Sequence, residues 1–450
     1  MSWNQEQIIA MAPDSASVKA AQKLTNTSKW PLLEFNDDAI WGHCQGSGSK
    51  PYMSRIDLSG PAFKCSCPSR KFPCKHGLAL FLLYAQQQSG FTRQQDAPDW
   101  VAEWLDSRAD REQKKVERAQ NKKPVDAAAQ EKRKGQREQK VSRGVEELSL
   151  WAEDVARTGL ADLQNKNYQY WKNLESRMVD AQAPGLANHV RQMASLAITG
   201  DRMSELAASL SRLYLLLNAY GRMEQLADDL QADIRTQIGW PWSQDELLAT
   251  PPVKDVWLAL SHSQTQEERL VMQVIHLVGL ESGRMAKVVN FAHETQRASL
   301  VMGWRGGQLI RGDAHFYPSG SPLRAIFADA ATLSPEHVGD THTTPAGISL
   351  DAMFNQYEQL LARNPWVGPY PFIVDAVVPW RQDDAFWLVD ADGKAVPLAE
   401  RAGDLWKLLA VSGGHPVRVV GEWCGDRFNP LGVWAEHQYF DVTSRQALAA

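Results

Sequence analysis

The chain of 450 residues is too long for one ordinary hydrophobic core, so we expect two to four domains. Its composition, with 44% hydrophobic and 22% charged residues, is that of a globular protein. The longest apolar run, residues 77–85, is about half of the ~20 residues that a transmembrane helix needs, which argues against a membrane span. The N-terminus, MSWNQEQIIA, lacks the basic flank and apolar core of a secretory signal, so we expect a cytoplasmic protein.

Charge is unevenly distributed along the chain. Residues 1–143 hold 23 Lys and Arg against 16 Asp and Glu, a net charge of +7, so the remainder carries −12 of the total of −5. A positive N-terminal third on an acidic body is compatible with an end that faces nucleic acid. It is equally compatible with a basic linker that binds nothing.

The first 95 residues predict a small module. Residues 15–28 have the pattern of a short helix, and residues 77–88, GLALFLLYAQQQ, are apolar at helical spacing. Between these helices, Gly- and Ser-containing turns separate β-rich segments at 38–47, 50–60 and 61–65. We therefore predict two or three strands, a metal-binding knuckle and a helix over residues 1–95.

Three further regions follow. Residues 96–143 have almost no apolar side chains and predict a charged helical or disordered linker. Residues 144–255 repeat apolar side chains at helical spacing and predict a helical domain. Residues 256–450 are β-rich with at least two helices, which predicts an α+β domain. The fold class expected for the whole chain is multidomain α+β.

The stretch CSCPSRKFPCKH, residues 65–76, contains three of the five cysteines and one of the eleven histidines. Cys65 and Cys67 are separated by one residue, as are Cys74 and His76, and residues two apart in an extended chain project to the same side. Each pair can therefore offer two ligands to one ion. Three thiolates and an imidazole suit tetrahedral Zn²⁺, and with all four positions filled by protein the site would be structural.

Other interpretations of the cysteines and histidines stay open at this point. A disulfide between Cys65 and Cys67 would close a very small, strained ring. A catalytic cysteine beside a histidine would not explain why three cysteines are present. A second group of metal-ligating residue types, EHVGDTHTT at 336–344, has no predicted helix to align its side chains.

The pattern Cys-x-Cys, a short loop and Cys-x-His resembles the SWIM zinc finger. The stretches CQGSGSKPY, GPAFKCSCPSRKFPCKHGLAL and FYPSGSPLRA are similar to the bacterial SWIM zinc finger family. The resemblance implies one structural Zn²⁺ held by Cys65, Cys67, Cys74 and His76. SWIM modules are associated with DNA binding and with protein–protein contacts. Members of the bacterial family tend to be encoded near a MoxR-type AAA+ ATPase and a von Willebrand A protein, which implies a role as partner or adaptor.

Basic residues lie between and around the four ligands. One interpretation is a surface that contacts the phosphates of nucleic acid. The other is electrostatic, because Zn²⁺ with three thiolates and a neutral imidazole has a net charge of −1 that nearby cations would stabilise. The basic residues concerned are Lys50, Arg55, Lys64, Arg70, Lys71 and Lys75. Two aromatic residues, Phe63 and Phe72, either stack on bases or fill the small core.

The sequence supports three functional hypotheses. The first, which we favour, is a non-enzymatic cytoplasmic adaptor that binds other macromolecules through its zinc module and C-terminal domain. The second is nucleic-acid binding through the basic residues at 50–75 and 108–143. The third is an enzyme with an unrecognised site in the C-terminal domain, which the lack of HExxH, GxSxG, kinase and dinucleotide-binding motifs disfavours. The tryptophans of the last domain line a binding surface or pack in the core: Trp366, Trp380, Trp387, Trp406, Trp423 and Trp434.

Overall fold

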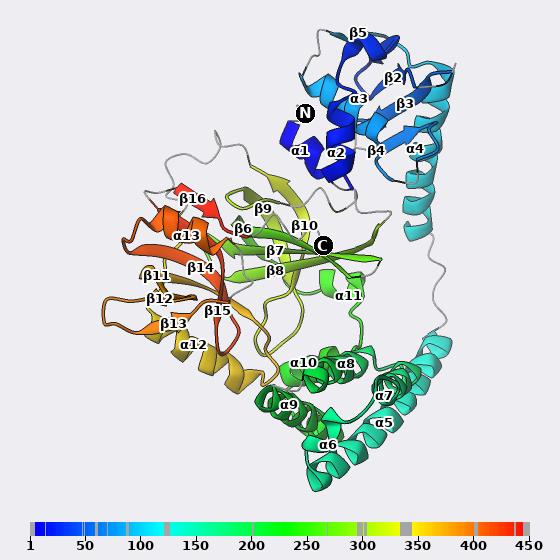
Figure 1. The fold of residues 1–450 in the computed structure, drawn as a ribbon. Coiled ribbons are helices and arrows are strands. Elements are labelled where there is room, and N and C mark those ends of the chain that lie inside the picture. The colour runs from blue at the N-terminus through cyan, green and yellow to red at the C-terminus, as the bar shows by residue number, and fades with distance from the viewer. Residues whose placement is uncertain are drawn as a thin grey trace.

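The computed structural model contains three parts, each with its own core: an N-terminal α/β module, a helical bundle and a C-terminal domain with two β-sheets (Figure 1). The predicted multidomain α+β fold is thereby confirmed. No described helix is long and apolar enough to cross a membrane. The structure describes residues 5–13, 15–46, 48, 50–58, 62–69, 71–86, 90–120, 127–199, 202–267, 269–294, 300, 304–333, 344–399, 404–435 and 438–443.

A five-stranded sheet in the order β4-β3-β2-β1-β5 forms the centre of the N-terminal module. Strands β1 to β4 make an antiparallel meander, and β5 pairs parallel with β1. The predicted β segments correspond to β2, β3 and β4. The sequence does not predict β1 and β5, because strands of four and two residues are too short to show an alternating pattern. The strands are β1 (Leu32–Phe35), β2 (Ala39–Cys44), β3 (Tyr52–Asp57), β4 (Ala62–Cys65) and β5 (Thr92–Arg93).

Helices cover one face of this sheet. The apolar helix α3 is buried from His76 to Leu83 because it lies between the sheet and the two N-terminal helices. The core formed there includes Ile8, Ile40, Ile56 and Phe81. The elements of this layer are α1 (Gln5–Ala10), α2 (Ser15–Gln22), the short 3-10 helix η1 (Thr27–Lys29) and α3 (Lys75–Gln86).

The first turns of α4 (Asp99–Gln120) cover the opposite face of the sheet. Val101 is fully buried and packs with Trp41 of β2, and Trp100 and Leu105 border the same cluster. The sequence predicts a charged helical or disordered linker over residues 96–143, and the structure has helices there. The sequence does not predict that the first turns of α4 pack on the sheet, because the few apolar residues lie on one helix face and the charged residues that follow dominate the composition of the region.

The middle of the chain folds into a helical bundle, as predicted. Its core begins at Val141, inside the predicted linker, because the long helix α5 starts well before the bundle and enters it gradually. The core is formed mainly by leucines and other aliphatic side chains facing inward from α5, α7, α8, α9 and α10. The helices are α5 (Ala127–Thr158), α6 (Ala161–Gln164), α7 (Tyr168–Asp180), α8 (Pro184–Thr199), α9 (Met203–Gly221), the 3-10 helix η3 (Met223–Gln225), α10 (Asp228–Ile238) and α11 (Gln244–Leu248).

The first C-terminal sheet has the strand order β10-β9-β6-β7-β8 and is antiparallel throughout. One face carries a cluster around Trp257, and the other contributes Leu258, Leu260 and Val278 to the interior of the domain. The strands are β6 (Val253–Glu267), β7 (Leu270–Gly279), β8 (Met285–His293), β9 (Leu309–Phe316) and β10 (Ala325–Thr332).

The second C-terminal sheet has the order β13-β12-β11-β14-β15-β16. Ile373, Val420 and Trp434 on one of its faces pack against the first sheet, while two helices cover its other face. The elements are α12 (Leu350–Arg363), β11 (Tyr370–Gln382), β12 (Ala385–Val389), β13 (Ala395–Pro397), α13 (Leu405–Ser412), β14 (Val417–Trp423), β15 (Phe428–Ala435) and β16 (Gln438–Asp441).

The bundle docks on the C-terminal domain next to α12 (Figure 1). Trp366, which follows α12, belongs to the core of the bundle and donates from its ring nitrogen to the Arg212 carbonyl at 3.1 Å. Asp233 of α10 accepts a hydrogen bond from the backbone amide of Gly320 at 2.8 Å, and burial raises the pKa of this carboxyl. Trp366 therefore fills the bundle core although the sequence places it in the C-terminal domain.

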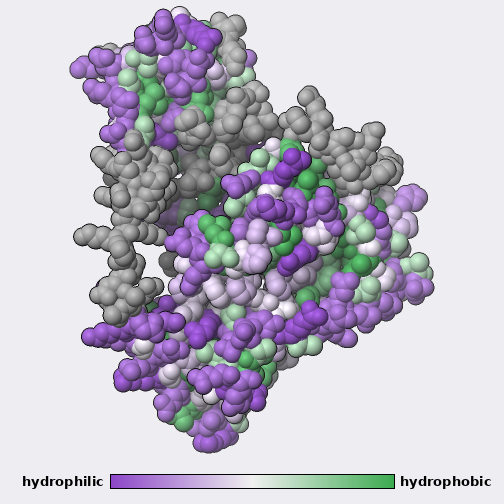
Figure 2. All heavy atoms as spheres, turned by 180° about the vertical axis from the view of Figure 1, so that it is seen from behind, coloured by the Kyte–Doolittle hydropathy of each residue, from purple (hydrophilic) through white to green (hydrophobic). Residues whose placement is uncertain are grey.

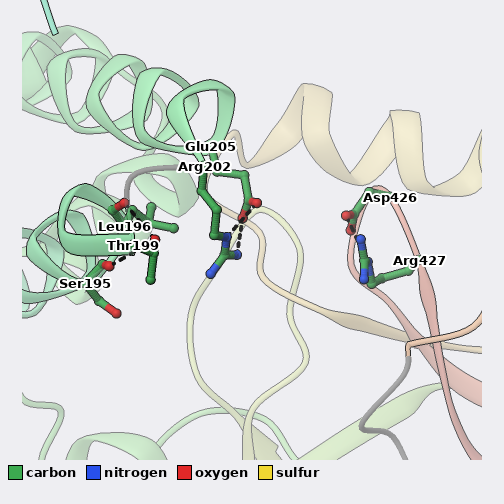
Figure 3. Close-up of polar contacts among 7 residues, drawn as sticks. All are labelled: Ser195, Leu196, Thr199, Arg202, Glu205, Asp426 and Arg427. Carbon is green, nitrogen blue, oxygen red and sulfur yellow. Dashed lines mark hydrogen bonds and ion pairs between the residues drawn. The ribbon is translucent and has the colours of Figure 1, made fainter. Parts of the chain in front are cut away.

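One charged pair of the bundle and one of the C-terminal domain lie on the two sides of the boundary between these parts (Figure 3). Arg202 and Glu205 at the start of α9 form an ion pair, and the turn between β14 and β15 presents Asp426 and Arg427. The hydrogen bond from Arg202 lowers the pKa of Glu205, and the charge of Arg427 adds to this shift across the domain boundary. The bundle and the C-terminal domain thus meet through the apolar ring of Trp366 and present charged side chains to each other's field.

Candidate metal centre

The four predicted ligands meet where the sheet of the N-terminal module turns into α3. Cys65 ends β4, Cys67 lies in the turn that follows, Cys74 immediately precedes α3 and His76 is its second residue. Their ligand atoms all lie within 4.8 Å of one another. The spacing of the sequence therefore places two donors at the end of a strand and two at the start of a helix, around one point.

The geometry of the four donors fits one zinc ion. Tetrahedral Zn²⁺ with Zn–S distances of about 2.3 Å holds two sulfur atoms about 3.8 Å apart. Cys65 Sγ lies 3.8 Å from His76 Nδ1, so Nδ1 is the imidazole nitrogen that faces the cage. Cys74 and His76 are buried and the other two ligands are half-buried, which leaves a compact cage without room for a substrate. The site is that of one structural zinc ion.

The protonation of the thiols also favours a cation at this point. Hydrogen bonds from Cys65 and then from His76 and the Gly77 amide lower the pKa of Cys74 to about 4. The same contact with Cys74, together with burial, raises the pKa of Cys65, and burial raises that of Cys67. Three thiols this close cannot all ionise on their own, because like charges repel. A divalent cation removes this conflict by binding all three thiolates.

Residues at the N-terminus of α3 stabilise the cage. The backbone amide of Gly77 lies 3.5 Å from Cys74 Sγ and donates to it, so the N-terminus of the helix stabilises a thiolate there. A Cβ atom at Gly77 would come within 3.1 Å of the Phe63 ring, so a larger residue here would require that ring to shift slightly. The Tyr52 ring lies against the imidazole of His76, with 4.8 Å between the ring centres.

The two aromatic residues beside the ligands differ in position. Phe63 is buried and packs edge-on against Phe81 of α3, so it fills the small core. Phe72 is 45% exposed and contacts Phe63 at its edge. Cys44 of β2 lies in the same core outside the cage, and burial raises the pKa of its thiol to about 11.

The predicted basic residues occupy different environments around the cage. Lys50, Lys64, Lys71 and Lys75 are exposed, whereas Arg70 lies outside the described residues. Arg55 of β3 is half-buried under α4. Lys29 and Lys75 lower the pKa of Cys44, which lies outside the cage, against the larger effect of burial. The exposed lysines leave both interpretations, phosphate contact and stabilisation of the zinc thiolates, as predictions. The cluster at 336–344 lies almost wholly outside the described residues.

Arg55 takes part in a ladder of side chains that the sequence does not predict. Its guanidinium carbon lies 5.0 Å from the centre of the Trp100 ring and 5.5 Å from that of Trp104, both on α4. Arg108 follows over Trp104 at 5.7 Å and forms a 2.9 Å ion pair with Asp57 of β3. Burial lowers the pKa of Arg55. The only sequence signal for this ladder is the spacing of the two tryptophans in a charged helix.

A closed cage of three cysteines and one histidine between a short β-meander and a helix defines a structural zinc finger. Two family models match this chain. The SWIM zinc finger matches residues 64–85, and the SWIM-associated four-helix bundle domain matches residues 136–238. The chain thus carries a SWIM zinc finger and, after α4, the helical bundle that accompanies it. No curated protein and no solved structure matches the chain.

Proposed function

We propose that the protein is a non-enzymatic cytoplasmic adaptor, in which the zinc finger maintains the N-terminal module and the C-terminal domain binds a protein partner. The closed zinc shell supports a structural role for the metal, because no position is open for water or substrate. The five free cysteines support a reducing compartment, where clustered thiols bind metal rather than form disulfides.

The C-terminal domain contains a serine, a histidine and a glutamate in a hydrolase-like arrangement. Ser261 Oγ lies 2.8 Å from His276 Nδ1, and His276 Nε2 lies 3.0 Å from Glu422 Oε1. In a hydrolytic triad the serine contacts Nε2 and the acid contacts Nδ1, the reverse of this order. Ser261 is fully buried and His276 is 2% exposed, so a substrate does not reach either side chain. These three residues support the packing of the two sheets rather than catalysis.

The single observation that carries the adaptor proposal is an exposed group of aromatic residues at the β11–β12 hairpin, which we call the aromatic hairpin. Trp380 is 55% exposed, and Trp406 of α13 is 61% exposed. On one face of the hairpin, the Arg381 guanidinium lies 4.9 Å from the Trp406 ring centre and 5.8 Å from that of Phe386, so these three side chains are held together before any partner binds. Trp380 precedes Arg381 in β11 and therefore points to the other face of the hairpin, where Trp387 lies directly opposite it on the neighbouring strand.

The composition of the aromatic hairpin is that of a protein-binding surface. Trp and Arg are the side chains that contribute most binding energy at protein–protein interfaces, where large rings leave water together. A rigid ring–guanidinium stack loses little conformational entropy on binding. The first partners to test are those that the family resemblance implies, a MoxR-type AAA+ ATPase and a von Willebrand A protein.

The adaptor proposal is tested by affinity capture from the native host, with nuclease treatment, and by direct binding to the two purified candidate partners. The full-length protein is compared with a Trp380→Ala, Trp406→Ala double variant. A Leu150→Ala, Tyr168→Ala variant is the matched control, because these bundle residues are 60% and 70% exposed. We expect nuclease-resistant partners to bind the wild type and the control but not the double variant. Capture that disappears with nuclease, or that the double variant retains, contradicts the proposal.

A further inference from the structure

We propose that one face of α5 binds the phosphate backbone of a nucleic-acid duplex, at a site separate from both the zinc finger and the aromatic hairpin. The face consists of Lys132, Arg133, Lys140 and Arg143, which we call the α5 basic stripe. All four side chains are exposed. At 3.6 residues per turn they fall within about 100° of the helix circumference and span about 16 Å along its axis.

The opposite side of α5 fixes the direction in which the stripe points. Val141, Val145 and Leu148 are buried in the bundle core. Arg137 donates to the Gly239 carbonyl at 3.1 Å, and its guanidinium lies 5.2 Å from the Trp240 ring centre. The stripe is therefore displayed on a rigid helix, so that ordering it on binding costs little conformational entropy.

The charges of the stripe are available for a partner. No described residue forms a salt bridge with any of its four side chains. Glu138 is the sole acidic residue between Lys132 and Arg143 in the sequence, and it faces Arg235 of the bundle at 3.9 Å. Several other basic side chains of the bundle are paired with acidic ones, as in the 2.7 Å pair of Lys166 with Asp162. An unneutralised row of cations on an otherwise acidic protein is complementary to a polyanion.

The chemistry of the stripe favours a nucleic-acid backbone over an acidic protein. Gln136 and Gln139 lie among the four cations, and no aromatic or aliphatic side chain lies between them on this face. Protein interfaces need an apolar core to become stable, whereas binding to a phosphate backbone is largely electrostatic and includes hydrogen bonds from glutamine. The bundle surface seen in Figure 2, in the lower part of the view, is mainly hydrophilic. A length of about 16 Å along the axis of a duplex contains about nine phosphates, counted over both strands at one per ~1.7 Å.

The proposal is tested by fluorescence anisotropy with labelled 20-base-pair DNA and RNA duplexes and the full-length zinc-loaded protein. If all four cations contact phosphates, the logarithm of the affinity falls with the logarithm of salt concentration with a slope of about −3.6, so binding weakens about 150-fold between 50 and 200 mM salt. Changing Lys132, Arg133, Lys140 and Arg143 to Gln should remove this binding at 50 mM salt. Tighter binding to one of the two duplexes shows whether the stripe binds DNA or RNA.

A matched control removes the same number of positive charges from the same bundle. Lys166, Lys172, Arg177 and Arg191, each paired with an acidic side chain, are changed to Gln, so the two variants have equal net charge. We expect this control to retain binding. Equal loss in both variants, retained binding in the stripe variant, binding lost instead on a Lys64→Gln, Lys75→Gln change, or equal affinity for polyglutamate each overturns the proposal. The aromatic-hairpin variant should bind duplex normally, so failure here is separate from failure of the adaptor proposal.

Discussion

The N-terminal module and the C-terminal domain stabilise their interiors in different ways. In the module, twelve consecutive residues supply all four zinc ligands, and the metal compensates for a small core on each side of a five-stranded sheet. In the C-terminal domain, two sheets are joined by apolar side chains and by a contact between His276 and Glu422, which are 146 positions apart. The fold of the module therefore depends on one local site, and that of the C-terminal domain on pairings distributed along the chain.

Loss of zinc should produce the largest difference in stability between the module and the C-terminal domain. Structural zinc supplies roughly 10 kcal/mol or more to small zinc-binding units, so a Cys74→Ser change should unfold most of the module. The C-terminal strands should keep their amide protection, because they share no core with the cage. Hydrogen exchange by mass spectrometry, with zinc content measured in parallel, checks both expectations.

The control for this experiment is Cys44→Ala, which removes a thiol from the same core but not from the cage. It should keep one zinc per chain. Two results would contradict the ligand assignment: near-unit zinc in a Cys65→Ser, Cys67→Ser double variant, or loss of C-terminal protection on chelation that equals the loss in the module.

The second test concerns the C-terminal domain alone. Burial by itself would raise the pKa of Glu422, but its contacts with His276 and with Lys287, 2.8 Å away, lower this pKa to about 2 from 4.5. A carboxyl whose pKa is lower in the folded state stabilises that state above pH 4.5, and this contribution disappears as the pH falls towards 2. The shift corresponds to about 3 kcal/mol at neutral pH.

A Glu422→Gln variant should therefore be less stable than wild type at pH 7 and should lose less stability on acidification. Hydrogen exchange of β7 and β14 peptides between pH 7 and pH 3, corrected for intrinsic exchange rates, measures this. Glu358→Gln on the exposed side of α12 is the control and should retain the wild-type pH dependence. If both variants show the same acid sensitivity as wild type, the contact between the sheets does not stabilise the domain.

The zinc cage could be predicted from sequence because its ligands lie close together and their residue types specify the metal. The order of module, helical domain and β-rich domain could likewise be predicted, because each has its own hydrophobic period. The pairing of Ser261, His276 and Glu422 could not, because nothing local to any of the three indicates its partners. Trp366 shows the same limit, since it follows a C-terminal helix but fills the core of the bundle.

The boundary of the module illustrates a different limit. Its sheet needs a cover on both faces, and the sequence from residue 96 onward is so rich in charge that it predicts a linker. Trp100 and Trp104 are spaced by four residues and therefore lie on one helix face. Their partner, Arg55, is a charged residue on a strand, so a search for apolar partners does not identify the contact.

The smallest expected effect tests whether this ladder joins α4 to the module. Arg55→Ala removes the guanidinium from between Trp100 and Trp104 and should cost about 1 kcal/mol, the size of a partly desolvated cation–π contact. Peptides from residues 99–108 should then exchange their amide protons faster while zinc content stays at one per chain. The control is Lys64→Ala, because Lys64 lies opposite Arg55 on the neighbouring strand but is exposed. If Arg55→Ala releases zinc or if Lys64→Ala loosens α4 equally, the ladder is not what holds α4 on the sheet, and the module ends with β5 rather than with the first turns of α4.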